Sequence, residues 1–213
     1  MELYFSPMAC SLATRIALYE AGAAARYTEV DTQSKRIVDG DADFWAVNPM
    51  GQVPTLRTDD GRLLSENAAV LQHVAEALPQ AGLLPPDSAG RDAVRQWIGF
   101  IGTELHKAVM VPRLDPQAPP EVKAYAGQKA SLRLQLLERH LEGRDYLVGD
   151  RFSVADAYLA TILNWAPYAE VDLKAYPALR AYHRRIAQRP AVARAIGEEF
   201  ELYKQELARR QTA

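Results

Sequence analysis

Cys10 has the clearest potential for chemistry in this sequence, because it is the only cysteine among 213 residues. It lies in the stretch SPMACSLATR, after an alternating segment that predicts a strand and at the start of a run of good helix formers over residues 10–21. Unpaired N–H groups and the dipole at a helix start favour a thiolate, the form that attacks disulfides and electrophiles. Without a second cysteine, any redox cycle needs an external thiol. Position alone leaves a buried structural cysteine as an equal alternative.

The stretch GQVPTL, residues 51–56, predicts a place where a peptide-like ligand can bind. Pro54 stands at the start of an expected strand, where a proline removes no interior ladder bond. The backbone of Val53 is then free to pair with an extended ligand, as in strand addition. A simple corner between a loop and a strand is the alternative.

The stretch SENAAV, residues 65–70, predicts a strand end that runs into a helix. The first free amides of that helix suit a carboxylate, and Glu66 beside them suits an ammonium group. Together they suit the zwitterionic end of an amino acid. The alternative is an ordinary helix start capped by Asn67 or Ser65.

A histidine with small residues beside it marks a second candidate region on an expected helix. Gly99, Gly102, Thr103 and His106 recur at helical spacing and predict a face that a ligand or a partner chain approaches closely. A solvated or hydrogen-bonded packing histidine is the alternative for His106. No histidines have metal-ligand spacing and no nucleotide-binding motif is present, so we expect neither a metal site nor a cofactor.

The elements that must position these residues predict an α/β unit followed by an all-α unit. Leu3 and Phe5 alternate with Tyr4 in an expected half-buried strand, and residues 25–31 predict a second strand. Two short strands around Asp60 and Gly61 and a helix over 67–78 follow. We therefore expect one domain over residues 1–79, a Pro- and Gly-rich linker over 80–90, and a helical domain over 91–213.

The second half of the chain predicts helices only. Val94, Trp97, Ile98, Ile101 and Leu105 form one apolar stripe that predicts a buried helix face. Helical periodicity returns over 121–142, 154–166 and 177–188. Ser153 and Asp156 predict a capping box at the start of the helix over 154–166.

Composition excludes several classes of function. A formal net charge of −2 argues against general attraction to nucleic acid or to a membrane surface. No apolar run approaches the ~18–20 residues of a spanning helix, and the start MELYFSPMAC does not read as a signal peptide. We expect a cytoplasmic protein.

Four stretches in this order resemble the cytosolic glutathione transferases: LYFSPMACSLATRIAL, NPMGQVPTL, LLSENAAVLQHVAE and FSVADAYLATIL. The first resembles the bacterial beta class, whose members are of the cysteine type, and the similarity extends to about residue 190. The resemblance implies a thioredoxin-like N-terminal domain, an all-helical C-terminal domain, a homodimer and a cis peptide before Pro54. It implies glutathione as a co-substrate, a small hydrophobic electrophile as its partner, and no cofactor.

The resemblance also implies roles for individual residues. Val53 pairs with the cysteinyl part of glutathione, Glu66 and Asn67 hold its γ-glutamyl end, and Cys10 faces its sulfur. His106 reaches the thiol region as a second catalytic residue. The remaining glutathione-site positions are Lys35, Gln52, Pro54, Glu104 and Lys107, and the electrophile pocket draws on residues such as Met110, Trp165 and Tyr168.

The leading hypothesis is a transferase that presents the glutathione thiolate to an electrophile or exchanges it through a mixed disulfide at Cys10, with thiol-transferase or peroxidase activity included. The alternatives are a non-catalytic binding or regulatory member of the family, and a reductase or dehalogenase with one dedicated substrate. This sequence departs from the family at four positions. Asn67 replaces the usual Ser or Gly, and Phe5 replaces a common Tyr. Met8 replaces a frequent Gly, and Gly99 replaces a polar residue.

Overall fold

The computed structural model describes residues 1–212 and divides them into two compact units. The first unit joins residues 1–81 to the last helix, α8 (Pro190–Thr212), and the second holds residues 82–189. Packing therefore groups α8 with the sheet, although the expected division by sequence placed residues 91–213 together. No helix within residues 1–212 has the length and apolar character needed to cross a membrane.

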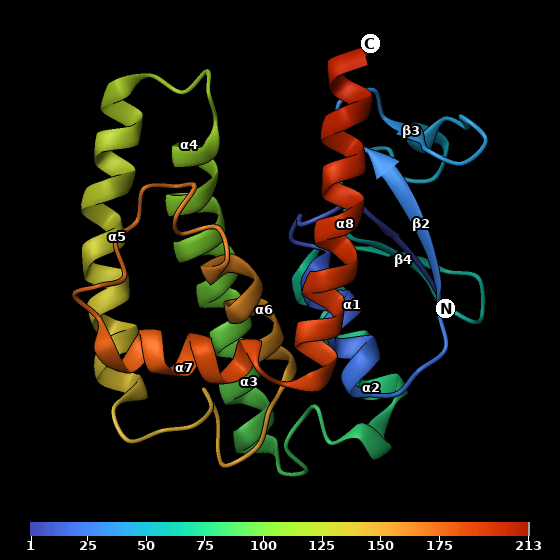
Figure 1. Cartoon of the computed structure of the whole chain (residues 1–213). Helices are drawn as coiled ribbons and strands as arrows, with labels where there is room; N and C mark the ends of the chain where they lie inside the picture. Colours follow the sequence, from blue (N-terminus) through green and yellow to red (C-terminus); the bar gives the residue numbers. More distant parts are fainter. Residues whose placement is uncertain (213) are drawn as a thin grey trace. The chain divides into compact units, whose positions relative to one another are not determined.

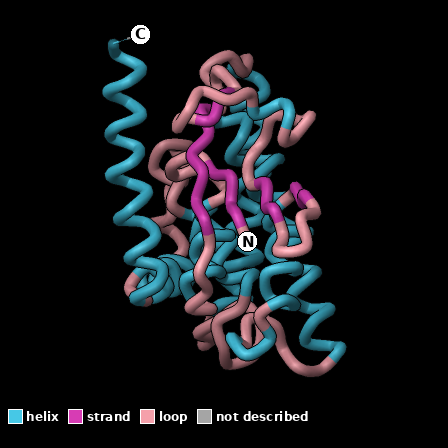
Figure 2. Tube along the Cα trace, turned by 90° about the vertical axis from the view of Figure 1, so that its right-hand side faces the viewer, coloured by secondary structure: helices cyan, strands magenta, loops and turns pink. Residues whose placement is uncertain are grey.

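The first unit is built on a five-stranded sheet with the order β3-β2-β1-β4-β5. The strands are β1 (Glu2–Phe5), β2 (Arg26–Asp31), β3 (Arg36–Ile37), β4 (Thr55–Arg57) and β5 (Leu63–Ser65). Only β1 and β2 run parallel, and the other neighbours pair antiparallel. The helices α1 (Leu12–Glu20) and α2 (Asn67–Ala77) and the short helix η1 (Phe44–Ala46) contact the sheet, and the short helix η2 (Pro79–Ala81) contacts α2. Figures 1 and 2 show these elements.

The expectation of a half-buried first strand is wrong, because β1 is buried on both faces. Leu3, Tyr4 and Phe5 are all at most 5% exposed. As the central strand of the sheet, β1 contacts α1 on one side. On its other side, Tyr4 packs in a cluster with Val30 and with Phe44 of η1. Because both faces of the sheet are covered here, residues that alternate in type along β1 do not alternate in burial.

An ion pair at the centre of the first unit joins α1 to α8, which lie side by side (Figure 1). The Arg15 Nε donates to the Glu199 Oε1 at 2.9 Å, and both side chains are almost entirely buried. The Arg15 guanidinium lies 4.3 Å from the ring centre of Phe5 and 4.2 Å from that of Tyr27. Phe5, which occupies a position where the family commonly has Tyr, therefore provides one of the aromatic rings that pack against this charge.

The second unit contains the helices α3 (Ser88–Phe100), α4 (Val111–Leu114), α5 (Pro120–Leu141), α6 (Val154–Leu163) and α7 (Pro177–Ala187). Between α3 and α4, the segment η3 (Ile101–Met110) is a π-helix, which the regular apolar stripe did not predict. The stripe itself is buried at Val94, Ile98, Ile101 and Leu105. The expected linker over 80–90 overlaps η2 and the first turn of α3, because the Asp87 side chain caps that helix at the N–H of Gly90.

The helix α6 is buried along its whole length, and its start is fixed by the expected capping box. The buried carboxylate of Asp156 accepts the backbone N–H of Ser153 at 2.9 Å and its hydroxyl at 2.8 Å. It also accepts the backbone N–H of Leu147 at 2.9 Å and the hydroxyl of Tyr182 at 2.8 Å. One side chain thus joins the loop before α6 to α7.

We predict that Asp156→Ala destabilises the folded chain by about 3–5 kcal/mol, because it leaves several buried donors without an acceptor. Urea unfolding followed by circular dichroism measures the change. The control is Asp92→Ala, which removes an exposed ion pair with Arg95 and is expected to cost less than about 1 kcal/mol. Equal losses in the two variants would show that the Asp156 network contributes nothing beyond a surface ion pair.

Candidate functional site

Cys10 lies in a tight turn between β1 and α1 and is half-buried. The Cys10 Sγ lies 3.3 Å from the carbonyl oxygen of Val53 and donates to it. The hydroxyl of Ser11 closes the turn, since it accepts the N–H of Ser6 and donates to the Ser6 carbonyl, each at 3.3 Å. Met8 has a φ of +58°, a conformation that glycine adopts without strain. That conformation explains why the family often has Gly there.

The helix α1 begins at Leu12, two residues later than the sequence predicts, so Cys10 lies in the turn that precedes it. The carbonyl of Cys10 accepts the N–H of Ala13 at 3.3 Å. Cys10 is therefore not sealed in the apolar interior, and the buried structural alternative does not describe it.

Val53 and Pro54 form the second part of the site, and the expected cis peptide between them is present. The N–H of Val53 donates to no group within residues 1–212. The loop before it is shaped by Asn48, whose Nδ2 donates to the Gln52 carbonyl and to the Thr55 hydroxyl, each at 2.9 Å. Sequence reasoning gave no role to Asn48, although the Asn-Pro pair of NPMGQVP is a turn signal.

Glu66 and Asn67 form the third part, at the start of α2. Glu66 is exposed and has a φ of +68°, a rare conformation for a residue with a side chain. Its carbonyl accepts the N–H groups of Ala69 and Val70, which leaves those of Asn67 and Ala68 without a partner in residues 1–212. The alternative of a cap by Asn67 or Ser65 is wrong, because neither side chain caps the helix.

The side chain of Asn67 is buried and points back to the Cys10 turn. Its Nδ2 donates to the carbonyl of Cys10 at 3.1 Å, and its Oδ1 is buried without a partner among the described residues. The start of α2 is thereby tied to the Cys10 turn. A serine would be too short to make this connection, so Asn67 adds a structural bond at the position where the family has a smaller residue.

Lys35 joins the site from the turn after β2. Its Nζ donates to the carbonyl of Gly51 at 2.9 Å and lies 5.9 Å from the ring centre of Trp45. Gly51 is required here, because it has a φ of +58° and an added Cβ would lie 2.9 Å from the Trp45 ring. The structure therefore brings Lys35 next to the segment of Gln52 and Val53 that carries the rest of the site.

The other predicted site residues lie in the second unit, on the π-helical segment η3. The Glu104 carboxylate accepts the Nε of Arg133 on α5 at 2.9 Å, and Lys107 is exposed. His106 is only 6% exposed, its Nδ1 lies 2.9 Å from the Tyr158 hydroxyl, and its ring centre lies 5.1 Å from that of Trp165. His106 is thus a hydrogen-bonded, packed histidine.

The expected face of small residues around His106 is not a continuous surface. Gly99 and Thr103 are exposed, whereas Gly102 faces the Tyr158 hydroxyl, which an added Cβ would approach to 3.6 Å. The wider turn of a π-helix moves residues off the lines that ordinary helical spacing predicts. Gly99 makes no close approach to any group, so nothing in the structure explains its departure from the family.

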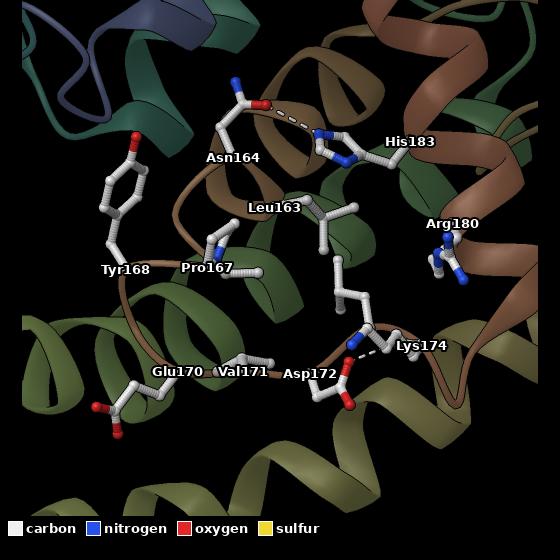
Figure 3. Close-up of a pocket in the computed structure, with 12 residues that line it drawn as sticks. Leu163, Asn164, Pro167, Tyr168, Glu170, Val171, Asp172, Lys174, Arg180 and His183 are labelled. Atoms are coloured by element: carbon white, nitrogen blue, oxygen red, sulfur yellow. Dashed lines mark hydrogen bonds between the residues drawn. The ribbon is translucent and has the colours of Figure 1, made fainter.

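The residues expected at the electrophile pocket have different environments. Met110 is fully buried in the core, and Trp165 contacts His106. Tyr168 is 71% exposed and lines a cavity of about 740 Å³ in the second unit. Figure 3 shows this cavity and the hydrogen bond from His183 to the side chain of Asn164. Within residues 1–212, no cluster of His, Cys, Asp or Glu is placed to hold a metal ion.

The pKa of His106 predicts how stability depends on pH. Burial, with a smaller contribution from the charge of Lys107, lowers this pKa to about 4, whereas an unfolded chain binds the proton near pH 6.5. Stability therefore falls as pH is lowered from 6.5 to 4, by up to roughly 3 kcal/mol from this residue. His106→Asn keeps an amide near Nδ1, and urea unfolding across this range should show a flatter dependence. An unchanged dependence would contradict the assignment.

Comparisons with known proteins match this chain to one protein family. A model described as the N-terminal domain of glutathione S-transferase matches residues 7–77, and one for the C-terminal domain matches residues 103–190. The chain is 40% identical over 200 residues to glutathione S-transferase GstA of Escherichia coli O157:H7, which covers 93% of this chain and 98% of the relative.

Solved structures agree with these matches. A ternary complex of BphK, a bacterial glutathione S-transferase, is 42% identical with a TM-score of 0.90, covering 93% of this chain and 99% of that one. A sphingomonad glutathione S-transferase complexed with glutathione is 44% identical with a TM-score of 0.88, covering 93% and 98%. These matches confirm the expected fold class, a thioredoxin-like domain and an all-helical domain. The chain belongs to the glutathione S-transferase family.

Proposed function

We propose that this enzyme binds glutathione on its sheet-bearing unit, with the tripeptide thiol beside Cys10. The observation that carries the proposal is the 3.3 Å separation between the Cys10 Sγ and the carbonyl oxygen of Val53. Val53 also offers an N–H without a partner among the described residues. A tripeptide that pairs with this backbone as an added strand has its central cysteine at the sulfur of Cys10. The glutathione complex of the sphingomonad relative supports this choice of ligand.

The two ends of glutathione meet groups of matching charge in this arrangement. At the γ-glutamyl end, the exposed carboxylate of Glu66 binds the ammonium group, and the free N–H groups of Asn67 and Ala68 bind the carboxylate. At the glycyl end, the ammonium of Lys35 binds the terminal carboxylate beside Gln52. The fixed backbone around Glu66 and Lys35, both at positive φ, keeps these groups in place.

Two reactions follow from a glutathione thiol held beside Cys10. In conjugation, the glutathione thiolate attacks an electrophile, and orientation supplies much of the rate. In thiol exchange, the Cys10 thiolate attacks the disulfide between glutathione and a substrate thiol, forms a mixed disulfide with glutathione and releases the substrate as a thiolate. A second glutathione then resolves the mixed disulfide and leaves as oxidised glutathione, because the chain has no other cysteine.

The helical unit contributes the electrophile side of the proposal. The cavity beside Tyr168 has apolar lining residues, such as Leu163 and Val171, and charged ones, such as Glu170 and Lys174. We place a small hydrophobic electrophile against its apolar part. Roles for Glu104, His106 and Lys107 toward glutathione stay predictions, and for His106 the role is that of a neutral hydrogen-bonding group. A dedicated reductase or dehalogenase would share the glutathione half of this site, and a panel of electrophiles separates these activities.

We also propose that the enzyme is a homodimer in the cytoplasm. Apolar side chains on α5 are at least 42% exposed and offer a surface for a second copy in a homodimer; they are Val122, Tyr125, Leu132 and Leu136. We place the enzyme in the cytoplasm, where a supply of reduced glutathione is available.

We predict that oxidised glutathione adds one glutathionyl group to the wild-type chain and none to Cys10→Ala, because only Cys10 can form the mixed disulfide. Mass spectrometry of the intact chain measures the addition, and a reducing agent should reverse it. If the wild type takes up no glutathionyl group, the covalent role of Cys10 is wrong. Calorimetry with reduced glutathione then tests whether the chain binds the co-substrate that conjugation requires.

We also predict that Glu66→Gln weakens glutathione binding about tenfold, because a charge-assisted bond to the ammonium group is worth roughly 1.5 kcal/mol or more. Glutamine keeps the shape of the side chain and removes only its charge. The matched control is Glu76→Gln, an exposed glutamate near the other end of the same helix. Isothermal titration calorimetry measures both variants, and equal affinities would place the γ-glutamyl end elsewhere.

A further inference from the structure

Glu199 on α8 contacts the turn that carries Cys10, although 189 positions separate the two residues in the sequence. Its side chain is fully buried. Its Oε2 accepts the backbone N–H of Met8 at 2.8 Å, and Met8 is two residues before Cys10. The family models matched at residues 7–77 and 103–190 include the turn but not Glu199.

The other oxygen of the Glu199 carboxylate binds Arg15, a buried arginine of α1. The Glu199 Oε1 accepts the Arg15 Nε at 2.9 Å, and the Arg15 guanidinium packs against the rings of both Phe5 and Tyr27. The carboxylate therefore cannot turn away from Met8 without losing a buried ion pair. Its position is set by β1, β2 and α1 together.

The bond to Met8 acts on a backbone that is not at its intrinsic minimum. Met8 has a φ of +58°, which costs a residue with a side chain about 1 kcal/mol or more. In this conformation of the turn, the N–H of Met8 donates to the carboxylate of Glu199. The same turn aligns the Cys10 Sγ with the Val53 carbonyl and the Cys10 carbonyl with Asn67.

We propose that Glu199 is a positioning residue for the reaction, which holds the Cys10 turn in its productive conformation through the N–H of Met8. The inference rests on the proposed binding of glutathione beside Cys10. It assigns α8 a role in the chemistry of the site in addition to its part in the fold.

The test compares Glu199→Gln with Glu198→Gln in the full-length chain. A glutamine at 199 can accept from Met8 or from Arg15 but presents its NH₂ group to the other, so it breaks the double acceptor without changing size. Glu198 is the matched control: it is the adjacent residue, loses the same charge, also contacts Arg15, at 3.4 Å, and is 41% exposed. No bond from Glu198 to the Cys10 turn is present among the described residues.

Three measurements, made well below the unfolding temperature, test whether the hydrogen bond between Met8 and Glu199 holds the Cys10 turn. In Glu199→Gln we expect faster hydrogen exchange in residues 6–11, at least threefold faster alkylation of Cys10 by iodoacetamide, and a kcat/KM for glutathione tenfold to a hundredfold lower, as small misplacements cause. Glu198→Gln should match the wild type in all three. Because Cys10 is the only cysteine, the alkylation rate reports on this site alone.

The outcomes separate positioning from simple stabilisation. If Glu199→Gln unfolds more easily but keeps wild-type exchange, alkylation and kcat/KM at the lower temperature, the proposal is overturned and Glu199 only stabilises the fold. If the wild type does not use glutathione, the proposed function fails. Hydrogen exchange and Cys10 alkylation then still decide whether Glu199 holds the Cys10 turn. Should Glu199→Gln not fold, Glu199→Asp, which shortens the reach by one methylene, is measured in the same way.

Discussion

The sheet-bearing unit depends on one buried interaction, the ion pair between Arg15 of α1 and Glu199 of α8. Burial raises the pKa of Glu199 to about 7, and the charge of Arg15 and the N–H of Met8 oppose that rise. Removing one partner of such a pair typically costs about 3–5 kcal/mol, because the other charge stays buried alone. The pair therefore joins α8 to α1, and because Glu199 also accepts the N–H of Met8, it sets the position of the Cys10 turn.

Around that fixed point, the site is assembled from backbone groups more than from side chains. Met8 and Glu66 are both at positive φ, at +58° and +68°. Met8 belongs to the turn that carries Cys10, and Glu66 directly precedes α2. Unfavourable backbone conformations persist where the surrounding contacts determine them and are concentrated at functional sites. Here the determining contacts are the bonds from Glu199 to Met8 and from Asn67 to Cys10.

The sequence predicted the parts of this site that are local and missed those that require distant segments to meet. Cys10, Val53 and Glu66 each follow from nearby strand, helix and proline signals. Glu199 could not be found, because an acidic residue in a helix gives no sign that its partners Arg15 and Met8 are 184 and 191 residues away. The π-helix over Ile101–Met110 was missed because apolar spacing assumes ordinary turns. The buried position of His106 depends on Tyr158 and Trp165, which come from distant parts of the chain. The burial of both faces of β1 depends on η1, a short helix without a periodic signal.

A crystal structure of the chain with reduced glutathione tests the central claim most directly. The account predicts the glutathione sulfur within van der Waals contact of the Cys10 Sγ, its cysteinyl backbone paired with Val53, and its γ-glutamyl end at Glu66 and the first N–H groups of α2. Glutathione bound away from Val53, or with its sulfur turned from Cys10, would contradict the account even though the family and the fold would stand.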